Sequence, residues 1–191
     1  MDWKTRVAKW VHEERVWRAN ESTGTASLTA TPTTTAAWAL WNGEPTNGKY
    51  YVMLAAFAHV DSVPAALTQW GLHYQVSKLA IGTGAPAADL VTSTVVVNMK
   101  GNAGVYGGRA VISLALAVIN DRWSPIGTST SSLVNSLEGQ QVYESHRPAV
   151  LLPPGGLYSL HSVASVTTAD TVLGNIWAEV DASEIRELGL D

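Results

Sequence analysis

The sequence predicts a mainly β protein, an antiparallel β-sandwich preceded by an N-terminal amphipathic α-helix. Three observations predict it. About eight or nine apolar, β-prone runs of strand length follow residue 24. Turn-forming Gly, Pro and Asn residues separate these runs at intervals typical of sandwiches. One segment alone, near the N-terminus, has long helical periodicity. We expect a jelly roll, and an immunoglobulin-like sandwich is the alternative.

Residues 2–19 carry the helical periodicity. Trp3, Trp10 and Trp17 stand seven residues apart, and Val7 and Val11 fall on the same side of the predicted helix. This apolar stripe is expected to pack on the body of the molecule or on a neighbouring subunit. Trp3, Val7, Trp10 and Trp17 are therefore the predicted interface anchors. A membrane-surface helix is a less favoured reading.

The predicted helix divides the chain into three parts. We expect a helical arm and linker over residues 1–23, a β-sandwich domain over 24–181, and a C-terminal tail over 182–191. The tail is expected to be a short helical turn or loose. The linker is expected to lead into an edge strand over residues 25–31, which Pro32 ends.

Residues 35–60 predict a central hairpin. Two β-prone runs flank a turn that contains Asn42-Gly43 and Asn47-Gly48, which tolerate the backbone angles of a tight reversal. The second run is apolar at nearly every position, so it is expected to be covered on both faces.

Further strands are expected over residues 69–81, 90–99, 109–119 and 140–152. Residues 120–138 are polar and predict a long exposed loop. After the corner at residues 153–156, the runs 157–166 and 172–180 predict a closing hairpin.

Composition excludes several classes of function. Hydrophobic residues make up 46% and charged residues only 15%, against roughly 25% in ordinary soluble domains. The net charge of the chain is −4. Because the first 18 residues carry a net charge of +2, the remaining residues carry −6. An acidic body argues against nucleic acid as a partner. The absence of cysteine excludes disulfides and thiolate metal sites.

No catalytic, metal or cofactor site is predicted, and we expect the protein not to be an enzyme. His59 and Asp61 form the best pair of metal ligands, but two ligands do not make a site. The glycines of the stretch KGNAGVYGG lack the context and the lysine of a phosphate-binding loop. Tyr106 and Trp123 fall in predicted loops and are candidate ligand contacts. The alternative for Trp123 is that it folds back onto the sandwich.

Two stretches resemble structural proteins of tailed bacteriophages. TAAWALWNGEPTNGKYYVMLAAFAHV resembles the opening strands of small β-sandwich virion proteins. RPAVLLPPGGLYSLHSVAS, followed by VLGNIWAEV, resembles their closing strands.

The resemblance implies a capsid decoration or cement protein, or another minor protein of the virion. Such a protein is expected to be homo-oligomeric, with a trimer as the expected state, and to contact the major capsid protein or other virion proteins. The alternative from another class is a module that binds carbohydrate or a host surface through Tyr106 and Trp123.

Overall fold

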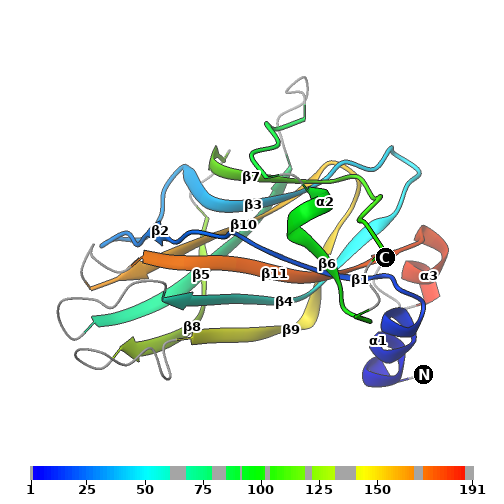
Figure 1. The fold of residues 1–191 in the computed structure, drawn as a ribbon, viewed down its shortest axis with the longest axis horizontal. Helices are drawn as coiled ribbons and strands as arrows, with labels where there is room; N and C mark the ends of the chain where they lie inside the picture. Colours follow the sequence, from blue (N-terminus) through cyan, green and yellow to red (C-terminus); the bar gives the residue numbers. More distant parts are fainter. Residues whose placement is uncertain are drawn as a thin grey trace.

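The computed structural model describes residues 2–60, 68–78, 85–90, 92–101, 104–118, 122–131, 141–165 and 170–187. Within these parts the chain forms two antiparallel sheets that stack face to face, with a helix at the N-terminus (Figure 1). The predicted mainly β sandwich with an N-terminal helix is confirmed.

The first sheet has six strands. Five follow the order β6-β1-β11-β4-β9, and β2 pairs with another part of β11. The strand bounds are β1 Val16–Asn20, β2 Thr25–Ala26, β4 Tyr50–Val60, β6 Val96–Asn98, β9 Gln141–Leu152 and β11 Asp170–Val180.

The second sheet has five strands in the order β7-β3-β10-β5-β8. Their bounds are β3 Thr35–Asn42, β5 Thr68–Lys78, β7 Ala110–Ala117, β8 Ser124–Ser131 and β10 Gly156–Ala164. The outer edge of β7 is capped, because the backbone N–H of Asp89 donates to Ile112 O at 3.0 Å and the Asp89 side chain accepts from Leu114 N. Capping of this kind hides an edge that would otherwise pair with another chain.

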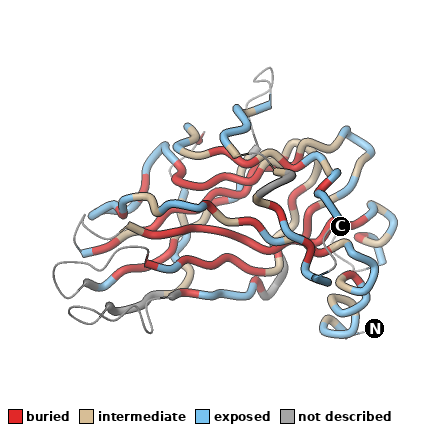
Figure 2. The backbone as a smooth tube through the Cα atoms, viewed as in Figure 1, coloured by how far each residue is buried: buried red, intermediate tan, exposed pale blue. Residues whose placement is uncertain are grey.

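Side chains on the strands alternate between the two faces of each sheet. In β11, Leu173 and Trp177 belong to the core between the sheets, whereas Ile176 and Val180 belong to a second cluster on the outer face. Figure 2 shows buried residues following the strands, while the N-terminal helix is largely exposed or half-buried. Trp38 in the core donates its indole N–H to Asn175 Oδ1 at 2.9 Å and so joins the two sheets.

The two predicted hairpins are wrong. β3 and β4 lie in different sheets, and so do β10 and β11. The connection between β3 and β4 is held by Asn42, whose amide donates to the carbonyls of Lys49 and Leu152 at 3.0 Å each. Turn residues specify a reversal of direction, but they do not specify whether the returning strand stays in the same sheet.

The predicted helix over residues 2–19 is too long. Helix α1 spans Trp3–His12, with Asp2 as its N-cap accepting from Thr5 N at 3.1 Å. The helix ends because Glu14 adopts a left-handed conformation, with φ of 62°. The next residues form β1, so Trp17 lies on a strand and not on the helical stripe. The arm and linker predicted over residues 1–23 therefore contain a strand of the six-stranded sheet.

Several shorter predictions are also corrected. The predicted loop 120–138 contains β8, and the predicted strand 90–99 divides into a short helix α2, Thr92–Val95, and β6. The predicted edge strand 25–31 is reduced to β2 and an isolated bridge at Leu28. The short helical turn expected in the C-terminal tail is confirmed: helix α3 spans Ala182–Glu187, and its Ile185 is buried. The end of the predicted strand 69–81 lies outside the described residues.

We predict that Trp10→Ala lowers the free energy of unfolding by about 3–5 kcal/mol, because the Trp10 side chain has no exposed area and its loss leaves a cavity under α1. Urea unfolding measures the change. Lys9→Ala, on the exposed side of the same helix, is the control and should change stability by less than about 0.5 kcal/mol. Equal effects of the two variants would contradict the packing of α1 on the sheet.

Candidate functional site

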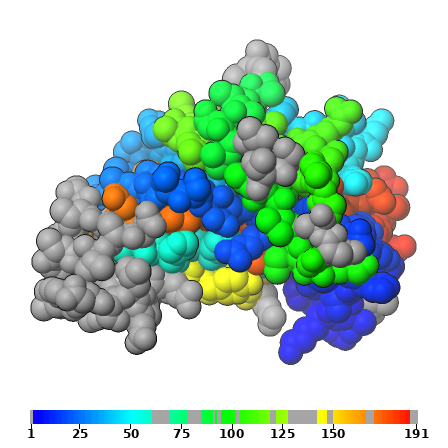
Figure 3. Space-filling view, in the orientation of Figure 1, coloured from blue at the N-terminus to red at the C-terminus, as the bar shows by residue number. Residues whose placement is uncertain are grey.

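The outer face of the six-stranded sheet carries an apolar groove beside α1. One hollow of about 400 Å³ lies between the helix and the sheet, and a second of about 320 Å³ continues from it. Met99, Tyr143 and Ile176 line both hollows, so the two form one groove. In Figure 3 the dark-blue surface of α1 and the green surface of the chain near residue 100 lie side by side at this end.

Large apolar side chains are exposed along the groove. Met99 is 42% exposed and Tyr143 is 61% exposed. Val97, at 50%, pairs with Arg18 across β1 and β6, and residues directly opposite in a ladder point to the same face. Contiguous exposed apolar surface is typical of an interaction site.

The charged residues that line the groove are all basic. Lys4 lines the first hollow, and Arg18 lines the second. The Arg18 guanidinium lies 4.7 Å from the centre of the Phe57 ring, which is a cation–π contact. Neither Asp nor Glu is among the described residues that line these hollows. The groove is therefore apolar with a basic rim.

The structure separates the four predicted anchor residues. Trp3 and Val7 line the groove, where they are half-buried. Trp10 is fully buried in the outer-face cluster, with its ring centre 5.8 Å from that of Trp3. Trp17 packs on the inner core, 4.9 Å from Tyr106. Two of the four anchors are therefore available at the groove.

Sequence reasoning missed Arg18, Met99 and Tyr143, which come from three separate parts of the chain. A sequence signal exists only for Tyr143, an aromatic residue that shares one face of its strand with the polar Ser145. Arg18, Met99 and Tyr143 lie close together because of the order of the strands in the sheet, which their spacing along the sequence does not predict.

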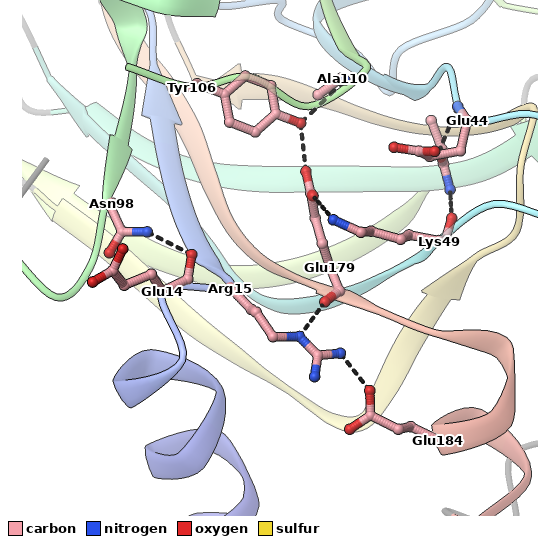
Figure 4. A network of polar contacts seen from close by, with 10 residues as sticks. Glu14, Arg15, Glu44, Lys49, Asn98, Tyr106, Ala110, Glu179 and Glu184 are labelled. Atoms are coloured by element: carbon pink, nitrogen blue, oxygen red, sulfur yellow. Dashed lines mark hydrogen bonds and ion pairs between the residues drawn. The ribbon is translucent and has the colours of Figure 1, made fainter. Parts of the chain in front are cut away.

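A polar network closes the end of the sandwich near α1 and α3 (Figure 4). The carboxylate of Glu179 is buried, accepts from Tyr106 OH at 2.5 Å and lies 3.4 Å from Lys49 Nζ. Arg15 donates through Nε to the carbonyl of Glu179 at 2.8 Å and pairs with Glu184 at 2.5 Å. The hydrogen bond from Arg15 lowers the pKa of Glu184. The network fixes β1 and α3 to the end of β11.

Tyr106 is a structural residue in this network. It is buried in the core, and its hydroxyl also accepts from Ala110 N at 3.1 Å. Burial raises the pKa of Tyr106, so the phenol keeps its proton and remains a donor to Glu179. Gly108 leaves room for this contact, because a Cβ there would lie 2.3 Å from the Tyr106 hydroxyl. Tyr106 is therefore not placed to contact an external ligand as predicted.

Trp123 lies against the outer face of the five-stranded sheet. Its indole N–H donates to Thr33 O at 2.8 Å, and its ring centre is 6.5 Å from that of His161. It is half-buried in a small cluster with Val118 and Leu157. The candidate ligand contacts Tyr106 and Trp123 are thus on different parts of the molecule, and both side chains have partners within the chain.

The described residues contain no group of three metal-ligating side chains. His59 is exposed beside the groove, whereas Asp61 lies outside the described residues. His146, at the groove, shares a hydrogen bond of 2.7 Å with Tyr158 OH. Burial lowers the pKa of His146, and it also lowers the pKa values of His73 and His161. No helix in the described parts of the chain has the length and apolar character needed to cross a membrane.

Comparisons with known proteins identify no family. No protein-family model matches the chain, and no curated protein matches it. A search of solved structures finds a weak similarity to a chain of the cryoEM structure of Mud Crab Dicistrovirus, with 9% sequence identity and a TM-score of 0.22. The alignment covers 86% of this chain and 66% of that chain. A similarity of this size supports no conclusion about fold or function.

We predict that Tyr106→Phe lowers the free energy of unfolding by about 1–3 kcal/mol, because it removes a hydrogen bond to the buried carboxylate of Glu179. Chemical denaturation measures it. Tyr143→Phe is the matched control, since the Tyr143 side chain is largely exposed, and it should leave stability nearly unchanged. A loss that is the same in both variants would show that the contact with Glu179 does not stabilise the fold.

We predict that the protein loses stability as the pH falls from 7 to 5. Burial holds the pKa of His146 below its ordinary 6.5, so below that pH the unfolded chain binds more protons than the folded chain. His73 and His161 act in the same direction. His146→Gln should therefore show a smaller fall than the wild type in urea unfolding at pH 7, 6 and 5. A wild type whose stability is constant over this range would overturn the prediction.

Proposed function

We propose that this chain is a structural protein of a virion, a capsid decoration or cement protein or another minor protein associated with the capsid. It self-associates, attaches to a capsid shell through the face formed by α1 and the groove, and catalyses no reaction. Its location is the virion. Its partners are further copies of itself, with a trimer as the expected state, and other virion proteins.

The observation that carries the proposal is the strand order. When β2, β6 and β7 are set aside, eight strands remain, in the orders β1-β11-β4-β9 and β3-β10-β5-β8. In these orders the first strand pairs with the last, the second with the seventh, the third with the sixth and the fourth with the fifth. We infer from this nested pairing that the sandwich is a jelly roll, not an immunoglobulin-like sandwich. Viral capsid and lectin domains are among the proteins that use the jelly roll.

The character of the candidate site favours a protein contact over a sugar contact. The groove is lined by aliphatic, Met and aromatic side chains, which suit the buried centre of a protein interface. The carbohydrate-binding alternative depends on Tyr106 and Trp123. Tyr106 is buried and Trp123 is bonded within the chain, so the two residues named for that alternative do not support it.

The composition supports attachment without nucleic acid. The body is acidic, which disfavours phosphate binding, and the few charges leave a surface able to pack against other subunits. Trp10 is occupied within its own chain, so the arm is proposed to contact the shell through Trp3 and Val7 at the groove and not through all four predicted anchors.

We predict that the purified full-length protein is a stable oligomer by light scattering. Val105 is 76% exposed, more than any other large apolar side chain that the structure describes, and we propose that it lies in the contact between subunits. Val105→Lys should weaken self-association about tenfold or more, whereas Met99→Lys, in the groove, should leave the oligomer intact. A monomeric wild type at micromolar concentration would contradict the proposed function.

A further inference from the structure

We propose that the groove beside α1 binds an apolar segment that carries acidic residues and belongs to a partner protein. The inference rests on the proposed function only in taking this face as the attachment face. It adds the chemistry of the partner, which neither the fold nor the composition specifies.

The shape and the lining of the groove suit an inserted segment of chain. Val7 and Val11 of α1 form one wall, and Leu54 and Ile176 lie on the sheet below them. Met99 and Tyr143 extend the apolar surface into the second hollow. A groove with apolar walls accepts an amphipathic helix through side chains spaced three and four residues apart. A flat partner would leave the floor of the groove unfilled.

The charges of the groove determine which segment fits. Lys4 and Arg18 lie at its two hollows, and no described acidic residue lines it, in a chain whose net charge is −4. Elsewhere in the described structure Lys9, Arg15, Lys49 and Lys100 each pair with a carboxylate of the chain.

Within the described residues, neither Lys4 nor Arg18 has a carboxylate partner. Arg18 contacts the Phe57 ring instead, and none of its guanidinium N–H groups donates a hydrogen bond to another described residue. Carboxylates on a docked segment would complement both cations, and complementary charges raise the association rate and fix the orientation of the partner.

The same features disfavour nucleic acid. A phosphate backbone requires a dense series of cations, and this groove has two permanent ones on an apolar floor. An anionic lipid surface combines apolar and negatively charged groups, as the proposed segment does, but it is flat on the scale of the groove. The experiment below therefore distinguishes a lipid surface from a peptide segment.

The test measures binding of two labelled peptides to the full-length protein by fluorescence anisotropy. Both are amphipathic helices of about 18 residues with leucine on one face, and they differ only in having glutamate or lysine on the other face. We expect the acidic peptide to bind at least tenfold more tightly in low salt, and the difference to shrink as salt screens the charges. Arg18→Gln should weaken binding of the acidic peptide several-fold, and Met99→Lys should weaken binding of both peptides. Arg109→Gln, an exposed arginine that does not line the groove, should change nothing.

Equal affinity for the two peptides would overturn the inference, and so would loss of acidic-peptide binding in Arg109→Gln to the same extent as in Arg18→Gln. Vesicles of phosphatidylserine that bind the wild type but not Arg18→Gln, with no peptide preference, would assign the face to a lipid surface. Disruption of the oligomer by Met99→Lys would assign the groove to a second copy. A wild type that is oligomeric but binds both peptides equally would refute this inference and leave the proposed function standing. A wild type that is monomeric but prefers the acidic peptide would support this inference and contradict the proposed function.

Discussion

Burial of β11 on both of its faces is the constraint on which the rest of the structure depends. From Thr171 to Val180 every residue of this strand is buried. The five-stranded sheet covers its inner face through contacts such as Trp38 with Asn175, and α1 covers part of its outer face with Trp10. β4 pairs along one edge of β11, and β1 and β2 share the other. A strand that is buried on both sides requires cover on both sides, so the N-terminal helix is part of the packing of the sandwich.

Helix α1 covers only part of the outer face of the six-stranded sheet, and the candidate groove lies beside it on this face. A helix of ten residues cannot span a sheet of six strands, so the outer face beyond it presents Met99, Tyr143 and Ile176. Glu179, at the end of β11, differs from this open apolar surface because it is a buried charged residue. Its carboxylate is buried but satisfied, by Tyr106 and Lys49, and such a group holds elements together without offering a reactive site. The apolar surface that remains open is therefore the feature available to a partner.

The chemistry of that surface connects the fold with the proposed role. The part of the outer face that α1 leaves uncovered is the surface proposed for recognition. In this chain the exposed part combines apolar side chains with Lys4 and Arg18, which have no carboxylate partners in the described structure. Apolar contact supplies affinity and unpaired charge supplies selectivity. We propose that recognition of a virion partner uses both properties.

Local features follow from the sequence alone: the strand-length runs that form β4, β5 and β9, a helix near the N-terminus, and the absence of any cysteine. These features depend on neighbouring residues, so pattern and propensity predict them. Three features depend on tertiary structure and could not be predicted from local patterns. β3 and β4 lie in different sheets, Trp17 lies on β1 and not on the helix, and Tyr106 is buried against Glu179. The tertiary structure also brought Arg18, Met99 and Tyr143 to one groove. Long-range pairing creates these contacts, and spacing along the chain carries no information about which distant strands will pair.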